Sequence, residues 1–416
     1  MKKIILLIRT PFYIFFIFMF ILLGCKNSNP KEKTYEEKII SKNLPWSTRL
    51  AQSFVQRHPG SVTYDEYMVS KNWGYEQGVI LEAMRQMYEL TADEQYYDFI
   101  KQNMEQYIES DGSIKTYNYE SFNIDNIAPG RSLLFLYGKT HEKKYKIASD
   151  LLRKQLLNQP RTLEGGFWHK KKYRYQMWLD GLYMAQPFYA QYSRMFNEPE
   201  NFNDIFFQFE AVYNHTYDKD SKLLYHGWNE NKKEKWADKE TGRSPHFWGR
   251  AIGWYLMAIV DVLDFIKDED NRRDRLIKIL NRICGALLKH RDSETGLWYQ
   301  IIDLPERNGN YLEASCAAMF TYIFAKGVNQ GYLDKKYLKI SEHSFNSIIK
   351  VHSKVDEKGY IDLYNTCRSA GLGGAPYRDG SFEYYMSEPK RTNDFKGYGP
   401  LLFAAIELEK TGLLNK

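Results

Sequence analysis

The stretch DNRRDRLIKILNRICGALLKHRD (residues 270–292) is followed, after a loop, by ASCAAMFTYIFAKG (residues 314–327). The first segment has apolar residues at helical spacing with many charges between them, which predicts an amphipathic helix on the surface. The second segment is mostly apolar or small, which predicts a helix that is buried on more than one side. Together the two segments predict a helical hairpin with one outer and one inner helix.

The same alternation recurs along the whole chain. Helical periodicity predicts twelve segments, and the hairpins repeat about every 50 to 85 residues, which fits a helical pair with its loop. Charged segments, which we expect outside, begin at Ala92, His141, Glu200, Asn271 and Lys335. Mostly apolar segments, which we expect inside, begin at Tyr75, Ile127, Leu179, Trp248, Leu312 and Tyr398, and one further segment begins at Trp46.

Six such hairpins closed in a ring form an all-α (α/α)6 barrel, which is the fold that the sequence predicts. An open superhelical solenoid is the alternative, and it would need polar capping repeats at its ends. Loops rich in glycine and aromatic residues follow the charged helices: ESDGSIKTYNYE, EGGFWHKKKY, DKDSKLLYHGWNE, DSETGLWYQI and DEKGYIDLYN. In a closed ring these loops lie on one face, where they would form a cleft for a small ligand.

The N-terminal residues are typical of an exported protein. Residues 1–24 combine a basic start with an apolar run and are predicted to be a signal peptide that ends in a bacterial lipobox before Cys25, the expected lipid attachment site. A single membrane-spanning anchor is the alternative, although the apolar run is shorter than the roughly 20 residues that a spanning helix needs. Residues 25–45 then form a polar tether, and residues 46–416 form the domain. We therefore expect a protein anchored by lipid in the bacterial cell envelope, on the periplasmic or the surface side of the outer membrane.

Charge and composition exclude several classes of function. The formal charge is +6, and three of these cations lie in the signal peptide, so the mature chain carries only 6 − 3 = +3. This charge is too small to indicate nucleic-acid binding. Cys284, Cys316 and Cys367 lack any CxxC spacing, so we expect packing residues and not a disulfide framework or a zinc site. Aromatic residues make up 16% of the chain, a composition that suits carbohydrate binding.

Asp180 stands out because it lies among bulky, mostly apolar neighbours in QMWLDGLYM. Asp is a common helix N-cap residue, so one interpretation is structural. In the other, a carboxyl group with little hydration keeps its proton near neutral pH and acts as an acid catalyst. Asp125, just before the segment that begins at Ile127, has the same two interpretations.

The loops place further candidate residues at the predicted barrel mouth. They are Trp73, Tyr75, Asn126, Trp168, His169, Lys170, Trp178, His226, Trp228, His246, Trp248, Arg250 and Trp254. The two histidines at 226 and 246 lack the HxxxH or HxH spacing of zinc ligands, so we expect no metal and no cofactor. Two carboxylates, a histidine, an arginine and several tryptophans together indicate a sugar-binding site with an acid and an anion-binding group.

In this order, the motifs IDNI, GGFWHKK, QMWLDGLYM, YHGW, WADKETGRSPHFWGRAIGW and GLWYQI resemble the unsaturated rhamnogalacturonyl hydrolases of glycoside hydrolase family 105. The resemblance runs from about Trp73 to Tyr398. It implies a hydrolase that removes a 4,5-unsaturated galacturonate from the non-reducing end of rhamnogalacturonan oligosaccharides by hydrating the C4=C5 bond.

The resemblance also implies roles for individual residues. Asp180 would be the general acid and Asp125 its partner carboxylate, with which it would share one proton. The implied substrate-binding residues are Tyr75, Lys170, Trp178, His226, Trp248, Arg250 and Trp254, with Arg250 on a carboxylate or hydroxyl group and the tryptophans as stacking walls. The implied partner is an oligosaccharide, and no obligate protein partner is expected.

Three alternatives to this function remain open on the sequence. The related unsaturated glucuronyl hydrolases would perform the same hydration on glucuronate from ulvan or glycosaminoglycans. An inverting glycosidase would use two carboxylates on saturated sugars. A glycan-binding lipoprotein would share the aromatic composition but would not catalyse a reaction.

Overall fold

The computed structural model describes residues 38–62 and 72–414, and within them the chain is mainly helical. Six helices have a charged or mixed sequence: α1 (Trp46–Arg57), α3 (Glu94–Met104), α5 (Lys143–Leu157), α7 (Asn201–Thr216), α9 (Arg272–Leu287) and α11 (Lys336–His352). Six others are mostly apolar: α2 (Tyr75–Thr91), α4 (Gly130–Thr140), α6 (Asp180–Met195), α8 (Gly249–Val262), α10 (Ala314–Asn329) and α13 (Phe395–Glu409). A short additional helix, α12 (Phe382–Ser387), was not predicted.

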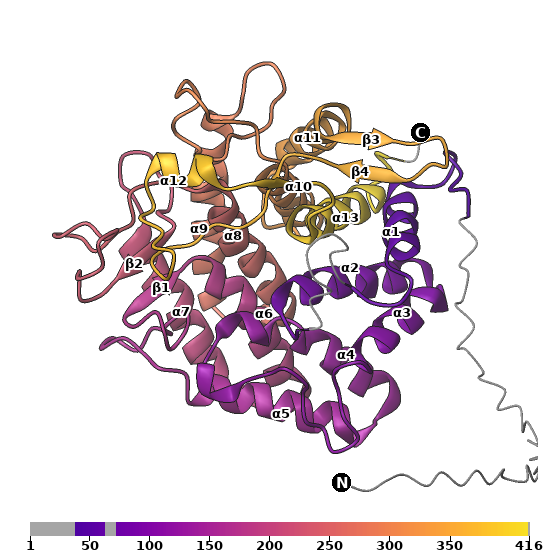
Figure 1. Cartoon of the computed structure of the whole chain (residues 1–416), viewed down its shortest axis with the longest axis horizontal. Helices are drawn as coiled ribbons and strands as arrows, with labels where there is room; N and C mark the ends of the chain where they lie inside the picture. Colours follow the sequence, from indigo (N-terminus) through magenta and orange to yellow (C-terminus); the bar gives the residue numbers. More distant parts are fainter. Residues whose placement is uncertain (1–37, 63–71, 415–416) are drawn as a thin grey trace, which may run out of the picture. The chain divides into compact units, whose positions relative to one another are not determined.

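The apolar helices form a closed inner ring. Helix α2 packs against α4, and contacts continue through α6, α8 and α10 to α13, which packs back against α2. The other six helices lie outside this ring, with α3, α5, α7, α9 and α11 each against the preceding apolar helix in the sequence (Figure 1). The predicted (α/α)6 barrel is therefore confirmed, and the open solenoid is excluded by the contact between α13 and α2.

Burial follows the sequence pattern. Every residue of α8 is buried, whereas α9 buries only one face, at Leu276, Ile279, Leu280, Ile283 and Leu287 and their neighbours. The three described cysteines are buried thiols, as expected of packing residues. Within the described residues, none of the helices is both long enough and apolar enough to cross a membrane.

A buried ionic network joins four of the inner helices. Arg131 on α4 contacts Glu82 on α2 and Asp261 on α8, each at 2.8 Å, and Lys326 on α10 contacts Asp261 at 2.9 Å. Buried charges are tolerated when they are paired in this way. The network therefore fixes the relative positions of these helices in the ring.

Short strands order the loops between the helices. The antiparallel pairs are β1 (Gln176–Trp178) with β2 (Gly227–Asn229), β3 (Ser353–Val355) with β4 (Ile361–Leu363), and β5 (Thr366–Cys367) with β6 (Lys390–Arg391). Four 3-10 helices are also present: η1 (Tyr119–Ser121), η2 (Ile124–Ile127), η3 (Leu263–Phe265) and η4 (Leu288–His290).

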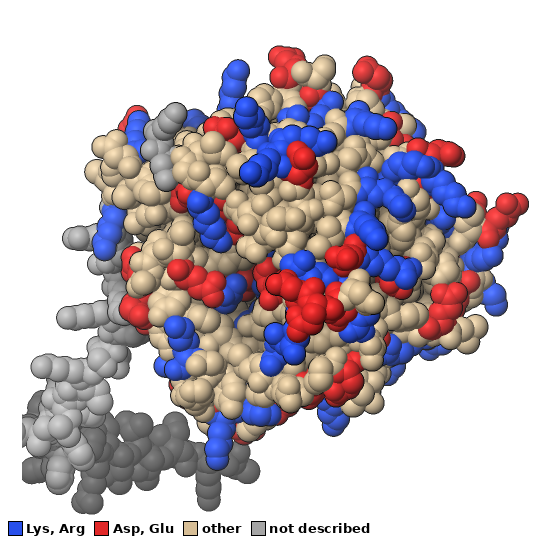
Figure 2. Space-filling model, turned by 180° about the vertical axis from the view of Figure 1, so that it is seen from behind, with Lys and Arg blue, Asp and Glu red and all other residues tan. Residues whose placement is uncertain are grey.

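The predicted signal peptide, Cys25 and most of the predicted tether lie outside the described residues. Ile40, which falls within the predicted tether, is buried, and its amide donates to the carbonyl oxygen of Lys358 at 2.8 Å. The chain is therefore already packed against the domain five residues before the predicted boundary. On the face shown in Figure 2, basic and acidic side chains are interspersed, which agrees with the small net charge.

Candidate active site

Asp180 is the first residue of α6 and directly follows Leu179, which occupies the N-cap position. The interpretation of Asp180 as an N-cap residue is therefore wrong. Its Oδ2 atom lies 3.2 Å from Nε2 of His226, and its side chain is 14% exposed. Pairing of β1 with β2 sets Trp178 opposite Gly227, which brings the histidine beside the start of α6.

His226 is completely buried and is held from its other side. Its Nδ1 atom lies 2.7 Å from the hydroxyl oxygen of Tyr385 on α12. Burial raises the pKa of Tyr385 well above its usual value, so the phenol stays protonated at neutral pH. The hydroxyl can therefore donate to Nδ1, and in that tautomer the N–H group at Nε2 faces Asp180.

Asp125 lies in η2, where the side chain of Asn123 accepts a hydrogen bond from the amide of Asp125. Asn123 is thus the capping residue, and the interpretation of Asp125 as an N-cap is wrong. The carboxylate of Asp125 contacts Nε2 of His169 at 3.2 Å and Nζ of Lys170 at 2.5 Å. Burial alone would raise the pKa of Asp125, but Lys170 and His169 outweigh it and hold the pKa well below its usual value.

Each candidate carboxylate therefore has basic partners of its own. This arrangement differs from the expected pair of aspartates with one shared proton, because both oxygens of Asp125 are bound by Lys170 and His169. At neutral pH Asp125 is ionised. The two groups can consequently perform different tasks in one reaction.

Trp178 connects the two carboxylate and histidine pairs. The ring of His169 stacks on it with centroids 4.4 Å apart and an interplanar angle of 18°, and His226 contacts it edge-on at 5.6 Å. Gly181 permits this packing, since a Cβ atom there would lie 3.1 Å from Nδ1 of His169. Trp178 also stacks on Tyr173 and is 5% exposed. Trp178 thus lies between the two histidines that face the candidate carboxylates, and a contact between Trp178 and substrate stays a prediction.

Arg250 is buried, and its guanidinium group is largely occupied by protein atoms. It contacts Glu313 at 3.2 Å, donates from Nε to the hydroxyl of Ser315 at 2.7 Å, and donates from Nη2 to the carbonyl oxygen of Cys367. Burial lowers the pKa of Arg250, but Glu313 together with Cys367, Asp394 and Tyr75 outweighs burial and raises it. Only Nη1 has no hydrogen-bond partner among the described residues. A contact between Arg250 and substrate stays a prediction that rests on this one nitrogen.

Trp248 and Trp254 are each 1% exposed. Trp248 packs against His226 with centroids 4.7 Å apart, and Trp254 stacks on Tyr183 at 4.8 Å. Tyr75 contacts Trp254 edge-on at 6.5 Å. Since these two tryptophans present almost no free ring surface, their role as stacking walls for sugar stays a prediction.

Other residues that the sequence suggested for the site make contacts that hold the loops in place. The indole of Trp73 donates to the carbonyl oxygen of Asn126 at 2.7 Å, next to Asp125. Trp228 stacks on His215 of α7, and Trp168 packs against Tyr175.

His246 lies beside Phe382 and Tyr385, with ring centroids more than 6 Å away, and burial lowers its pKa. The described residues contain no group of three or more His, Cys, Asp or Glu side chains that could hold a metal ion.

Arg378 was not predicted as a site residue, because it follows a glycine-rich loop without periodicity. Its Nε atom donates to the carbonyl oxygen of Gly373 at 2.8 Å and its Nη2 atom donates to the hydroxyl of Tyr173 at 2.7 Å. Its guanidinium carbon lies 5.7 Å from the ring centroid of Trp178. All these partners are uncharged, and no acidic side chain among the described residues forms an ion pair with it. Arg378 is therefore a partly buried cation next to Trp178, and its planar donors suit an anion.

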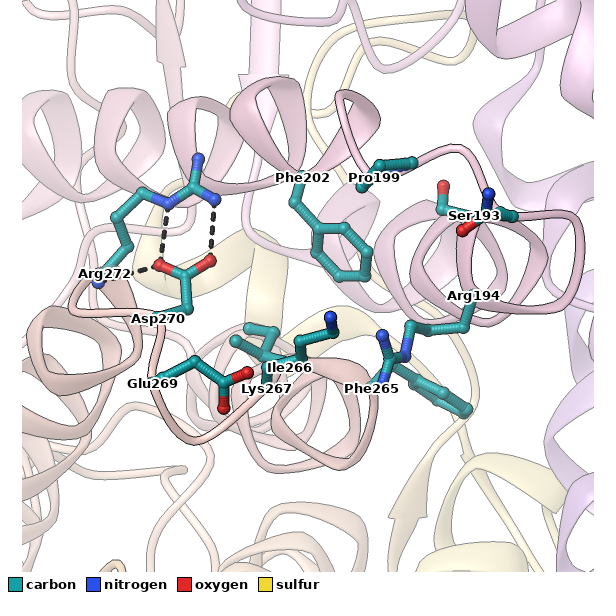
Figure 3. A pocket seen from close by; sticks show the side chains of 11 residues that line it. Ser193, Arg194, Pro199, Phe202, Phe265, Ile266, Lys267, Glu269, Asp270 and Arg272 are labelled. Atoms are coloured by element: carbon teal, nitrogen blue, oxygen red, sulfur yellow. Dashed lines mark hydrogen bonds and ion pairs between the residues drawn. The ribbon is translucent and has the colours of Figure 1, made fainter.

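A separate pocket of about 350 Å³ lies where α6 ends and α7 begins, next to η3. Phe202 and Phe265 line it, and Arg272 forms a bidentate pair with Asp270 at its edge (Figure 3). It contains none of the predicted site residues. The pocket therefore does not contribute to the arrangement around Asp125 and Asp180.

Comparison with known proteins identifies the family. The family profile described as Glycosyl Hydrolase Family 88 matches residues 46–412. The chain belongs to this family. A solved glycoside hydrolase from family 105 of C. acetobutylicum ATCC 824 is 42% identical, with a TM-score of 0.84 over 88% of this chain and 100% of that one. The predicted relationship to family 105 is thus confirmed, and the protein is a glycoside hydrolase.

Two curated relatives of this family 88 hydrolase have named activities. The unsaturated rhamnogalacturonyl hydrolase YesR of Bacillus subtilis (strain 168) is 27% identical over 295 residues, which are 70% of this chain and 78% of that protein. The unsaturated 3S-rhamnoglycuronyl hydrolase of Formosa agariphila is 27% identical over 189 residues, which are 44% of this chain and 49% of that protein.

Proposed function

We propose that this enzyme removes a 4,5-unsaturated uronate from the non-reducing end of an acidic oligosaccharide. The observation that carries the proposal is the pair of carboxyl groups with different surroundings. Asp125 is fixed as an anion by Lys170 and His169, whereas Asp180 begins an inner helix and faces His226. Two carboxyl groups with distinct environments are typical of sites that divide acid and anionic roles.

In the proposed reaction Asp180 donates its proton to C4 of the double bond. Positive charge then develops at C5, shared with the ring oxygen, and the nearby carboxylate of Asp125 stabilises it and orients the water. Water adds to C5, and its proton returns to Asp180. The resulting hemiketal opens, and the rest of the oligosaccharide leaves from C1 as an aldehyde forms. One water molecule is consumed, and both carboxyl groups end as they began.

Binding of the substrate carboxylate requires positive charge that is not already neutralised. Arg378 meets this condition, because its hydrogen bonds go to uncharged oxygens only. We assign Arg378 to the substrate carboxylate. Arg250 is already paired with Glu313, so it can add only a hydrogen bond from its free Nη1 atom. A guanidinium group suits this task, since its planar donors match the two oxygens of a carboxylate.

The preferred substrate is unsaturated galacturonate linked to rhamnose, in accord with the sequence motifs and with the relative named as an unsaturated rhamnogalacturonyl hydrolase. A second candidate is unsaturated glucuronate, which the relative named as an unsaturated 3S-rhamnoglycuronyl hydrolase favours. Formation of the C4=C5 bond removes the stereocentre at C4, where galacturonate and glucuronate differ. The two substrates therefore differ in the linkage at C1 and in the sugar that follows.

The test is incubation of the enzyme with the two unsaturated disaccharides, one of each kind, at matched concentrations. Hydration destroys the conjugated double bond, so the ultraviolet absorbance of the substrate falls as it reacts. We expect the larger kcat/KM with the galacturonate compound. A larger value with the glucuronate compound would establish the second candidate, and turnover of saturated glycosides alone would overturn the proposed function.

We also propose that the mature enzyme is attached to the cell envelope by lipid at Cys25, on the basis of the sequence Leu22-Leu23-Gly24-Cys25. The test is expression of the full chain in a bacterial host with the wild-type residue and with Cys25→Ala. We expect the wild type in the detergent-soluble membrane fraction and the variant outside it. Equal distribution of the two proteins would contradict the proposal.

A further inference from the structure

A second pocket, of about 590 Å³, lies beside the Asp125 site and has a strongly basic lining. It is lined by Ser121, Asn123, Lys170, Lys171, Lys172 and Arg174. Four of these six residues are cations, and none is acidic. We call this feature the basic rim pocket.

Most of the charge in the basic rim pocket is not neutralised by the protein. Lys170 is paired with Asp125 at 2.5 Å, but the contact between Lys171 and Glu120 is 3.6 Å long and both side chains are more than half exposed. Such exposed pairs contribute little. Lys172 and Arg174 form no ion pair with any described residue; Lys172 lies over the ring of Tyr173 at 5.0 Å.

The basic rim pocket shares residues with the surroundings of Asp125. Lys170 lines the pocket and also binds Asp125, and Asn123 lines the pocket and also caps the turn that carries Asp125. The amide of Lys171 donates to the carbonyl oxygen of Ser121 at 3.2 Å, which fixes the two loops to each other. A ligand in the pocket would thus lie against the same lysine side chain that binds Asp125.

We propose that the basic rim pocket binds a second carboxylate of the same oligosaccharide, on a uronate further along the leaving chain. The proposal rests on the proposed function, because only a substrate cut from an acidic polysaccharide would carry that second charge past Asp125. Lys172 and Arg174 supply the attraction. Since these side chains are exposed, the attraction weakens with added salt.

The experiment compares an unsaturated disaccharide, which has one carboxylate, with an unsaturated tetrasaccharide of alternating uronate and neutral sugar, which has two. The variant is Lys172→Glu with Arg174→Glu. The matched control is Lys278→Glu with Lys339→Glu, which makes the same charge change at exposed positions of α9 and α11. Each protein is measured at low and at high salt.

We expect the wild type to prefer the tetrasaccharide, and the preference to shrink at high salt. The pocket variant should lose about tenfold in kcat/KM on the tetrasaccharide, mainly through KM, and less than about twofold on the disaccharide. The control variant should resemble the wild type. Equal losses on both substrates, an equal effect of the control, or no loss at all would overturn the proposal.

A binding measurement separates this proposal from the proposed function. Calorimetry with a saturated uronate tetrasaccharide needs no turnover, so tighter binding by the wild type than by the pocket variant supports the pocket even if neither unsaturated substrate reacts. A disaccharide that carries one sulfate provides a further arm. If the sulfated disaccharide is the only compound that binds more weakly to the pocket variant than to the wild type, the assignment to a uronate carboxylate is wrong. It is also wrong if anionic vesicles bind more weakly to the variant and the tetrasaccharide does not.

Discussion

The Oδ2 atom of Asp180 lies 3.2 Å from Nε2 of His226, yet neither atom has an aligned hydrogen bond to a described residue. Asp125, in contrast, is bound through both oxygens. The first carboxyl group is therefore free to exchange a proton, and the second is fixed as a charge.

Substitution of the two aspartates should separate these roles. Asp180→Asn removes the proposed proton donor and should lower kcat at least about a thousandfold, whereas Asp125→Asn keeps a polar group and should lower it about a hundredfold. Turnover is measured by loss of the substrate's ultraviolet absorbance, and folding is checked by circular dichroism. Retention of near-normal kcat by Asp180→Asn would remove this residue from the mechanism.

Lys170→Met should make the enzyme sensitive to acid. The folded pKa of Asp125 lies below its unfolded value, so the ion pair contributes stability above the unfolded pKa, and this contribution is lost as pH falls through the folded pKa. Without Lys170, burial raises the pKa of Asp125, and activity should disappear at a higher pH. The free energy of unfolding at neutral pH should fall by about 2 kcal/mol.

The matched control is Lys101→Met, because Lys101 pairs with Glu142 at 3.6 Å on the surface, where both side chains are 38% exposed. This change should cost no more than about 0.5 kcal/mol and should leave the pH profile unaltered. Identical pH profiles for Lys170→Met and the wild type would contradict the assigned role of the ion pair.

Tyr385→Phe should disturb the active site through His226. The change removes the hydroxyl at 2.7 Å from Nδ1, which leaves a buried ring nitrogen without a partner and costs about 1–2 kcal/mol of stability. We expect kcat to fall about tenfold, because the tautomer and orientation of the histidine ring are no longer fixed. Tyr384→Phe is the control, since its hydroxyl accepts a hydrogen bond from the amide of Gly371 instead.

Arg250→Met should destabilise the fold strongly, because it leaves the buried carboxylate of Glu313 without its counter-charge. The expected loss is about 3–5 kcal/mol in denaturant unfolding. The double variant Arg250→Met with Glu313→Gln should recover part of this loss, since no uncompensated charge remains. Additive losses in the double variant would show that the two side chains do not act as a pair.

His352 should make the domain less stable in mild acid. Burial lowers its pKa to about 4, so between about pH 6.5 and pH 4 the unfolded chain binds a proton that the folded chain does not. Stability therefore falls as pH decreases through this window, by about 3 kcal/mol at pH 4. His352→Gln should remove that part of the pH dependence, which thermal melts of both proteins at pH 7 and pH 4.5 would measure.

The helical architecture was predictable because its signal is local and repeated. All twelve predicted helix starts lie within three residues of the observed ones; the segment expected at Trp248 begins at Gly249, for example. Strong apolar periodicity identified the inner helices. Helix α12 was missed since six residues give too little periodicity, and with it the sequence analysis missed Tyr385 as the partner of His226.

The positions of the two candidate carboxylates were also predictable, because Asp180 is the first residue of α6 and Asp125 lies in η2, shortly before α4. The side chains that contact these carboxylates were only partly predictable. Lys170 and His169 appeared among the candidates, but the capture of Arg250 by Glu313 depends on residues 63 positions apart in the sequence. Arg378 lies in an irregular loop, where spacing carries no information. Contacts between segments that are far apart in the sequence could therefore not be predicted, and the site was predicted only in part.

Contact between α13 and α2 joins the last helix of the chain to one of its first. The final wall of the barrel is thus supplied by residues 395–409, so the apolar sides of α2 and α10 stay uncovered until this segment has been synthesised. A chain that stops short of Phe395 would present both surfaces to chaperones and proteases. Substitutions that weaken α13 should consequently be more damaging to cellular abundance than comparable substitutions in an outer helix.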